Sequence, residues 1–498
     1  MEYSSFVDFL WIPEVGGEFQ VPGNALLRAD NVELLADGTL RGRKGTLKYN
    51  SSAEAGAIKG LWRHYPRTGT PVLLSATDVG ASVTLRVGTD IGGTFANVTG
   101  GTGLADVYHY FVNWPAKNKT FIANGTDNMK EYDGSTLADV NGSTPPAGPY
   151  LTVHKSRLWA TEPSELNYSV YASDINDENT WPAANHLQVS DPMGGTIRGL
   201  ASFMDSLLIF KSTSLWRFIG DIGTTIGAQL ARYSDKGCVA PNTICSTPFG
   251  VFFLANDGLY LTDGVNPIPQ EMSVPIRSLF RTRTANNTFP LAVGMWDPYR
   301  MQYVLTLDPS STTAYIVKRV PLTVEKNLLT GERTRVAWAW SLRTATPANA
   351  MCAWSGEGDS GQFLIGSQDG FVRYTDTGTT DDGTAITSTI KTASRLFDGK
   401  TMRTARVYNL SAQFRSVSPL TGALYYDNHP TSDVSFTLGD ASVGAEPKYH
   451  WRGYITNFAK QGRFVAVELS STESSAWELS WIKVDARFRS FRVRRNTN

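Results

Sequence analysis

Short runs in which hydrophobic and polar residues alternate recur along the whole chain. Residues 83–87 and 463–469 are examples, and each run is bounded by Gly or Ser. Hydrophobic residues rarely recur at positions i, i+3, i+4 and i+7 for more than one turn, and Gly or Pro interrupts almost every window that could form a helix. The pattern is typical of half-buried antiparallel strands joined by tight turns and predicts an all-β protein.

One hairpin pattern repeats: a hydrophobic strand, a polar turn and a second strand that ends near Asp or Gly. Clear copies occupy residues 121–134, 253–264 and 363–374, and weaker copies begin at Leu73, Arg157, Leu208 and Val304. The seven starts lie on average about 48 residues apart, which fits one four-stranded propeller blade of ~40–50 residues per copy. We therefore expect a six- or seven-bladed β-propeller over residues 51–385. The alternative is an irregular array of β-sandwiches with similar hairpins.

The two ends of the chain depart from this repeat. Residues 1–50 carry early Pro and Gly residues and an Asp37-Gly38 turn between two hydrophobic runs, which predicts an extended arm followed by a hairpin. Such an arm can lie on a neighbouring molecule. Residues 386–498 have strands of different spacing, and their hydrophobic alternation changes phase between Trp481 and Ile482, as a β-bulge would cause. We expect a separate antiparallel β domain there.

Composition narrows the possible functions. The 498 residues include 46 Lys+Arg and 46 Asp+Glu, so the zero net charge provides no general attraction for nucleic acid or an anionic membrane. The first apolar run, residues 6–12, is far shorter than the ~20 residues that span a bilayer and lacks signal-peptide features, so we expect no membrane insertion. Cys238, Cys245 and Cys352 are too few for a disulfide scaffold and match no zinc spacing.

Two motifs resemble parts of hydrolase sites. The GDSG sequence at residues 358–361 matches the nucleophile segment of chymotrypsin-like proteases, but none of His64, His109 and His154 has a fitting sequence around it, and an ordinary loop explains the match better. Residues 174–181 partly resemble the Asp-box turn of sialidases. Glu178 replaces the turn glycine, the motif occurs once, and no cluster of three arginines with a Tyr nucleophile is evident. A hairpin held by Trp181 is the structural alternative.

Paired carboxylates could hold Ca²⁺, which prefers six to eight oxygen ligands. The pairs are Asp257/Asp263, Asp369/Asp376 and Asp381/Asp382, none of which has EF-hand spacing. Asp in Gly-rich turns favours a structural role. A phosphate-binding Gly-Lys-Ser/Thr loop and a dinucleotide fingerprint are both missing from the sequence. We expect no metal, no cofactor and no enzymatic activity.

A cluster of arginines interleaved with Phe and Val closes the chain. It comprises Arg487, Arg489, Arg492, Arg494 and Arg495. Arginine beside aromatic residues can contact phosphates or stack on bases, a basic tail can clamp an acidic neighbouring subunit, and alternating Arg is common on a solvated strand face. Subunit contact, a solvated face and DNA contact therefore all stay open.

Several segments together resemble a known protein family. They read NALLRADNV (24–32), GTLRGRKG (38–45), HKSRLWA (154–160), YASD (171–174) with Trp181-Pro182, and Gly199-Leu200 leading to LIFK (208–211). Over about residues 10–380 the chain resembles the β-propeller tail proteins of short-tailed bacteriophages, called tail hub, nozzle or packaged-DNA stabilisation proteins.

The resemblance implies a structural component of the virion. Copies would form a ring, typically a hexamer, below the portal and adaptor, continue the DNA channel, retain the packaged genome and conduct it on ejection, with transient non-specific DNA contact. It implies no catalytic residues. Two other functions stay open: a glycan-binding or glycan-cleaving propeller on a tail, and a propeller scaffold for protein partners.

Overall fold

The computed structural model describes residues 3–6, 10–11, 25–35, 39–69, 71–88, 93–141, 145–162, 168–222, 228–277, 279–280, 289–327, 331–354, 361–396, 404–416, 419–438, 451–454, 460–472 and 477–488. The chain divides into two compact units. Unit 1 comprises residues 1–46, 315–344 and 376–498, and unit 2 comprises residues 47–314 and 345–375. The chain therefore passes between the units four times.

Unit 2 contains five four-stranded antiparallel sheets whose strands follow one another in chain order. Their strands are β7 (Ile58–His64), β8 (Val72–Asp78), β9 (Val83–Gly88) and β10 (Ala96–Asn97); β11 (Tyr110–Trp114), β12 (Lys119–Ala123), β13 (Lys130–Tyr132) and β14 (Leu137–Asp139); β15 (Leu151–His154), β16 (Arg157–Thr161), β17 (Ser169–Ala172) and β18 (His186–Gln188); β19 (Ile197–Phe203), β20 (Ser206–Lys211), β21 (Leu215–Ile219) and β22 (Gln229–Ser234); and β23 (Cys245–Thr247), β24 (Gly250–Ala255), β25 (Gly258–Thr262) and β26 (Gln270–Glu271). Short 3-10 helices lie in the connections: η1 (Pro115–Lys117), η2 (Pro241–Thr243), η3 (Val274–Ile276) and η5 (Phe289–Leu291).

Two further blades complete unit 2. The sixth contributes the antiparallel pair β27 (Val293–Asp297) and β28 (Gln302–Thr306). The seventh consists of β31 (Ala350–Trp354), β32 (Gln362–Gly366) and β33 (Val372–Thr375), and β6 (Thr46–Lys48) from the start of the chain lies beside β33. The outermost strand of the last blade thus comes from the beginning of the sequence.

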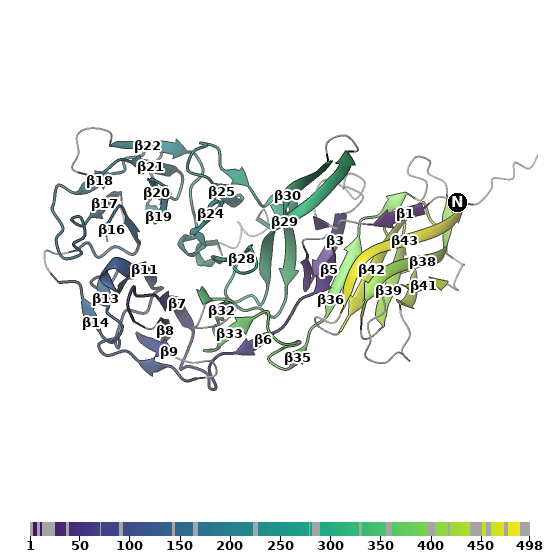
Figure 1. The fold of residues 1–498 in the computed structure, drawn as a ribbon, viewed down its shortest axis with the longest axis horizontal. Coiled ribbons are helices and arrows are strands. Elements are labelled where there is room, and N and C mark those ends of the chain that lie inside the picture. The colour runs from purple at the N-terminus through teal and green to yellow at the C-terminus, as the bar shows by residue number, and fades with distance from the viewer. Residues whose placement is uncertain are drawn as a thin grey trace, which may run out of the picture. The chain divides into compact units, whose positions relative to one another are not determined.

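The first strands of the blades form a closed ring. In the described part of unit 2, β7, β11, β15, β19, β23, β27 and β31 are neighbours in that order, and β31 also lies against β7 (Figure 1). Unit 2 is therefore a seven-bladed β-propeller. The predicted fold, a propeller with additional β structure, is confirmed, and the ring closure gives seven blades.

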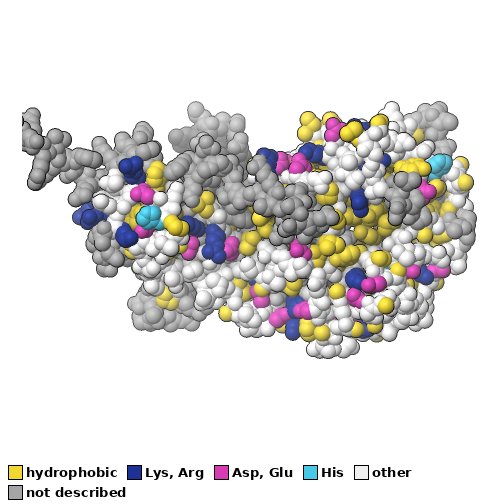
Figure 2. Space-filling view, turned by 180° about the vertical axis from the view of Figure 1, so that it is seen from behind, with side chains coloured by type: hydrophobic (Ala, Val, Ile, Leu, Met, Phe, Trp, Pro, Cys, Tyr) yellow, Lys and Arg dark blue, Asp and Glu magenta, His cyan; other side chains and the backbone are white. Residues whose placement is uncertain are grey.

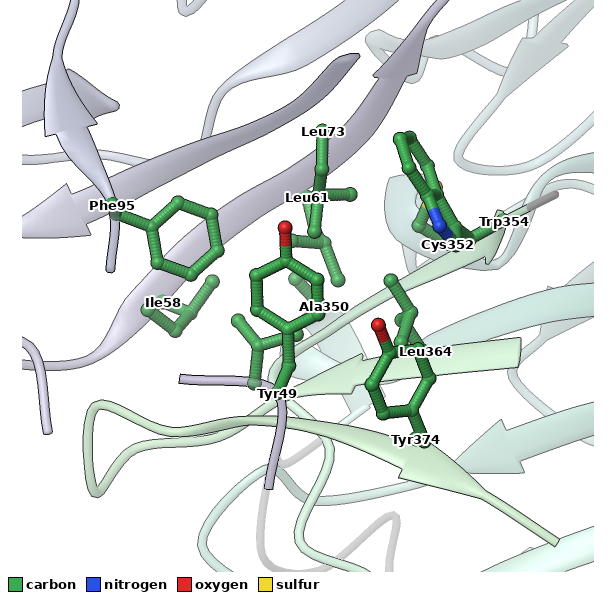
Figure 3. Packing of buried hydrophobic residues seen from close by; sticks show 11 residues of the cluster. Tyr49, Ile58, Leu61, Leu73, Phe95, Ala350, Cys352, Trp354, Leu364 and Tyr374 are labelled. Carbon is green, nitrogen blue, oxygen red and sulfur yellow. The ribbon is translucent and has the colours of Figure 1, made fainter. Parts of the chain in front are cut away.

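Hydrophobic clusters fill the spaces between neighbouring blades. The closure between the seventh and first blades is one of them: Tyr49, Ile58 and Phe95 pack with Leu364 and Tyr374 (Figure 3). The ring of Tyr49 lies 5.3 Å from that of Phe95 and 5.5 Å from that of Tyr374, centroid to centroid. Because each blade buries both faces against its neighbours, the blades stabilise one another.

Unit 1 contains two β-sheets. One has the order β4 (Val32–Leu34), β5 (Leu40–Gly42), β43 (Glu478–Phe488), β38 (Ala405–Arg415) and β41 (Trp451–Tyr454), with β1 (Tyr3–Phe6) on β43. The other includes β29 (Ala314–Asn327), β30 (Gly331–Arg343), β3 (Ala25–Asp30), β36 (Ser388–Thr392), β42 (Phe464–Ser471), β39 (Leu420–Tyr426) and β40 (Val434–Leu438), with β2 (Leu10–Trp11) on β3 and β37 (Arg395–Leu396) on β42. A small hairpin is formed by β34 (Thr380–Asp381) and β35 (Thr384–Ala385).

The division of the chain differs from the expected boundaries at 50 and 385. The N-terminal segment does not stand apart, because β3 pairs with β36 and β5 pairs with β43 inside unit 1. Residues 315–344, expected in the propeller, belong to unit 1 as β29 and β30, which span 14 and 13 residues against five or six in a typical strand. The predicted hairpin of β4 with β5 is confirmed, whereas Asp37, Gly38 and residues 12–24 lie outside the described residues.

The predicted phase change in the C-terminal strand is confirmed, but at a slightly different position. Opposite β38, Trp481 pairs with Gln413 and Leu479 pairs with Phe414, so Ser480 is the extra residue of a bulge. Leu479 and Ile482 are both fully buried on either side of it. The bulge lies just before Trp481 rather than after it, because Trp481 keeps a partly exposed position and donates to Gln413 Oε1 at 2.7 Å.

Candidate functional site

The central cavity of the propeller is a concave surface to which all seven blades contribute. Its volume is about 200 Å³, and its lining comes from residues 59–62, 108–111, 150–151, 199–200, 241, 242, 244, 293–295 and 349–351. Figure 2 shows hydrophobic side chains gathered in the middle of one face of unit 2. A cavity of this size can hold several water molecules or a small ligand.

Most polar groups of the lining are paired within the protein. Lys59 Nζ forms ion pairs with Asp78 Oδ2 at 2.9 Å and with Asp106. Burial opposes the charge of Lys59, but the hydrogen bonds to Asp106 and Asp78 outweigh it and raise the pKa of the ammonium. Tyr108 Oη donates to Asn349 Oδ1 at 2.6 Å, and Asn349 Nδ2 donates to the Ile58 carbonyl at 2.7 Å.

Sequence reasoning did not single out this cavity. Its lining residues lie on the first strand of each blade or just before it, and they come together only when the ring closes. The aromatic run Tyr108-His109-Tyr110-Phe111 was the available local signal.

The three histidines weighed for protease chemistry are buried and lie on or directly before the first strands of the first three blades. His109 Nδ1 donates to the Val107 carbonyl at 2.9 Å, and its Nε2 faces Asn124 Nδ2 at 3.2 Å. His64 Nδ1 lies 2.7 Å from Thr120 Oγ1, and His154 Nδ1 lies 2.9 Å from Ser202 Oγ. Burial lowers the pKa of His64 and of His109 to about 4 and also lowers the pKa of His154. These contacts with neutral partners favour a structural role.

The protease-like GDSG segment falls mostly outside the described residues, which include only its Gly361. A Cβ atom at Gly361 would lie 1.7 Å from Tyr299 Cε1, so this glycine is required for close packing against the Tyr299 ring. That contact gives Gly361 a structural reason to be glycine.

The Asp-box-like segment forms a tight turn in the third blade. Asp174 and Asp177 make an isolated antiparallel bridge, and Trp181 Nε1 donates to the Glu178 carbonyl at 2.9 Å while its ring is buried. The Glu178 carboxylate pairs with Lys117 at 3.0 Å and with Lys119 at 2.9 Å. The turn is thus held by Trp181, and the residue in place of the turn glycine serves an ion-pair network.

The carboxylate pairs weighed for Ca²⁺ are engaged by cations and backbone amides. Asp257 pairs with Lys236, Asp369 pairs bidentately with Arg373, and Asp381 pairs with Arg43. Asp263 accepts from the backbone N–H groups of Val265 and Asn266 at 2.9 and 2.8 Å, as a turn-forming Asp does. Among the described residues, no group of three or more His, Cys, Asp or Glu side chains is arranged to hold a metal ion.

The cysteines are free thiols. Burial raises the pKa of Cys238 and Cys352 to about 12 and that of Cys245 to about 11, so all three remain protonated near neutral pH.

Of the C-terminal arginine cluster, only Arg487 is among the described residues; Arg489, Arg492, Arg494 and Arg495 lie outside them. Arg487 is exposed on β43, directly opposite the exposed Arg406 of β38. Its guanidinium carbon lies 4.7 Å from the centroid of the Tyr408 ring. Two like charges opposite each other on a sheet are unfavourable alone, so this surface suits an anionic partner.

No family model matches the sequence, and no curated protein matches it. Among solved structures, the WD40 domain of Neurospora crassa Pan2 is similar, with 9% sequence identity and a TM-score of 0.40 over 67% of this chain and 97% of that one. In the part of the chain that the structure describes, no helix is long and apolar enough to cross a membrane.

Proposed function

We propose that this chain is a structural subunit of a bacteriophage tail nozzle or hub, which assembles with copies of itself into a ring, most simply a hexamer. In this role it contacts the portal or adaptor and other tail proteins, continues the DNA channel below them in the virion, and retains and later conducts the genome. Its proposed role is structural and not enzymatic.

The observation that carries the proposal is the closed seven-bladed ring around a cavity of about 200 Å³. Such a ring is a stable scaffold, and the charged side chains that line its centre or form its turns are mostly paired with each other. The resemblance to the tail proteins supplies the biological setting. A neutral chain also suits a channel, because a strongly basic lumen would hold DNA by releasing counterions and would impede its passage.

We place the proposed channel outside the single propeller. The major groove of B-DNA alone is ~12 Å wide, so a duplex cannot pass through a cavity that holds a few waters. In the proposed assembly the DNA therefore passes through the opening between copies, and the propellers form its wall.

Electron microscopy of the purified full-length chain, combined with mass measurement in solution, tests the proposal. The expected result is a ring of about six copies around an opening wide enough for a duplex. A monodisperse monomer at micromolar concentration and in purified particles would contradict it.

Incubation of the same sample with host polysaccharide, followed by chromatography of the products, tests the glycan alternative. Shortened polysaccharide or retention of glycan by a monomer would replace the nozzle proposal with a glycan-acting propeller.

A further inference from the structure

We propose that the central cavity of the propeller binds a small neutral aromatic molecule with one hydrogen-bonding group, of the chemical class of phenol. This site is independent of the proposed tail function, since every residue of its lining belongs to unit 2 of a single copy.

Aromatic rings are concentrated on the part of the lining that the first three blades contribute. Five aromatic side chains there are partly exposed: Trp62 on β7, Tyr108 just before β11, Tyr110 and Phe111 on β11, and Tyr150 just before β15. The rings of Trp62 and Phe111 are stacked with centroids 6.1 Å apart, and those of Tyr110 and Tyr150 meet edge to face at 5.1 Å. A ligand ring placed among them can make the same two kinds of contact, which are favourable beyond the area that they bury.

The fourth to seventh blades line the cavity mainly with aliphatic and thioether groups. These include Leu200, Ile244, Val293, Met295 and Met351. Methionine is flexible enough to fill gaps around a ligand, and its sulfur makes favourable contacts with aromatic rings. The whole lining therefore rewards the transfer of an apolar ring out of water.

The charges of the lining favour a neutral ligand. The described residues of the lining include no Asp or Glu. Their cation, Lys59, is paired with Asp78 at 2.9 Å and with Asp106. His109 donates to the Val107 carbonyl, and burial lowers its pKa to about 4, so its ring is uncharged near neutral pH. An ionic ligand would lose its hydration without gaining an unpaired opposite charge among these residues.

Asn242 can recognise the polar group of the ligand. It lies in η2, lines the cavity and is partly exposed, and its side-chain amide makes no hydrogen bond with a described residue. By contrast, Tyr108 and Asn349 of the lining are bonded to each other at 2.6 Å. The Asn242 amide offers two donors and an acceptor. A hydroxyl group on the ligand thus finds a partner at one place in an otherwise largely apolar lining.

The volume of the cavity fits a single substituted ring. An apolar protein cavity of ~150 Å³ can hold benzene. The central cavity, at about 200 Å³, has room for a benzene ring with one small substituent. Ligand pockets typically combine such a mostly apolar lining with a few polar groups that fix orientation.

Saturation-transfer NMR titration of the full-length protein with phenol, toluene and cyclohexanol tests the site, with binding counted per chain so that the result does not depend on ring assembly. We expect saturable binding of phenol at about millimolar concentration or below, as is usual for so small a ligand. Toluene, which lacks the hydroxyl, and cyclohexanol, which lacks the aromatic ring, should each bind at least about threefold more weakly. Asn242→Leu should remove the advantage of phenol over toluene while leaving toluene binding within about twofold.

Met295→Trp tests whether the ligand occupies the cavity. The larger side chain fills part of the space, so phenol and toluene should both bind at least about tenfold more weakly. Met193→Trp is the matched control, since Met193 is 70% exposed and lies outside the lining. Thermal unfolding without ligand shows whether each variant folds.

Phe111→Leu keeps the test decisive if Met295→Trp does not fold. It preserves an apolar side chain but removes one ring, so phenol should bind about threefold more weakly. The proposal is overturned if the wild-type protein binds phenol without saturation, if cyclohexanol binds as tightly as phenol, or if folded Met295→Trp and Phe111→Leu proteins bind phenol as tightly as the Met193→Trp control. Equal binding of phenol and toluene by the wild-type protein would overturn the role of Asn242.

Discussion

The backbone N–H of Val372 donates to the side-chain Oδ1 of Asn50 at 2.8 Å, and this bond joins residues 322 positions apart. Asn50 Nδ2 donates in turn to the carbonyl oxygens of Gly370 and Ser52 at 3.0 and 2.7 Å. The Tyr49 N–H donates to the Val372 carbonyl oxygen at 2.7 Å. One buried side chain therefore fastens the beginning of the propeller to its last blade and closes the ring.

Asn50→Ala should open this closure. It removes three hydrogen bonds and leaves the buried Val372 N–H without its acceptor, so we expect unfolding free energy to fall by about 2–4 kcal/mol. Urea unfolding measures the loss, and amide hydrogen exchange should show faster exchange in β31–β33 than in β15–β17. Asn128→Ala is the control, since Asn128 makes an exposed bond to Asp139 and should cost about 0.5 kcal/mol or less. Equal losses in the two variants would show that the closure does not depend on Asn50.

Sequence reasoning located the blades because their second strands carry the strongest signal. All seven predicted hairpin starts, from Leu73 to Phe363, fall within β8, β12, β16, β20, β24, β28 and β32. These strands are buried on both faces; every residue of β20 and β24 is buried, for example. The outer strand β22 is largely exposed and gives little pattern.

What the sequence could not provide depends on contacts between distant residues. The pairing of β6 with the last blade requires ring closure, and no local pattern records it. The unusual length of β29 and β30 did leave a trace. The interval from Val304 to Phe363 is the longest between hairpin starts, which fits strands of 14 and 13 residues in that interval.

Arg43 should be essential to unit 1 because it ties together its three separate chain segments. Its buried guanidinium donates to Asn31 Oδ1 at 2.8 Å, to the Thr344 carbonyl at 2.9 Å and to both carboxylate oxygens of Asp381. Arg43→Ala leaves the Asp381 charge without its partner, so we expect a loss of about 3–5 kcal/mol in the unfolding of unit 1. Arg43→Lys should restore only part of it, because an ammonium cannot make the bidentate pair.

Differential scanning calorimetry measures this loss. The resistance of each unit to trypsin, assayed separately, shows whether the loss is in unit 1. Arg28→Ala is the control, since Arg28 is half exposed and should change stability by less than about 0.5 kcal/mol. An Arg43→Ala protein as stable as the control would mean that the network contributes little.

Propeller stability should fall as the pH falls from about 6.5 to 4. Burial lowers the pKa of His64 and His109 from 6.5 to about 4, so between these values the unfolded chain binds more protons than the folded one. The stabilisation is therefore complete above pH 6.5 and is lost as the pH approaches 4, at most about 3 kcal/mol per histidine at 1.36 kcal/mol per pH unit.

Urea unfolding at pH 7 and pH 4.5 measures the effect. The double variant His64→Gln, His109→Gln should lose less stability over this range than the wild type, whereas His186→Gln, which removes an exposed imidazole, should follow the wild type. If all three proteins lose the same free energy, the buried histidines do not cause the pH dependence.

Arg487 should matter for assembly and not for folding. It is exposed opposite Arg406 and stacks near Tyr408, an arrangement worth about 0.5–1 kcal/mol at an exposed site. Arg487→Glu should thus leave the unfolding free energy within about 1 kcal/mol of wild type. If this surface contacts an anionic face of a neighbouring copy, charge reversal should shift the ring toward monomers, as mass photometry at fixed protein and salt concentration would show.

Lys130→Glu reverses another partly exposed charge, on β13 of unit 2, and should leave assembly unchanged. Weaker DNA retention with normal rings would assign Arg487 to DNA contact, and no change in either would leave it a solvated residue of the sheet.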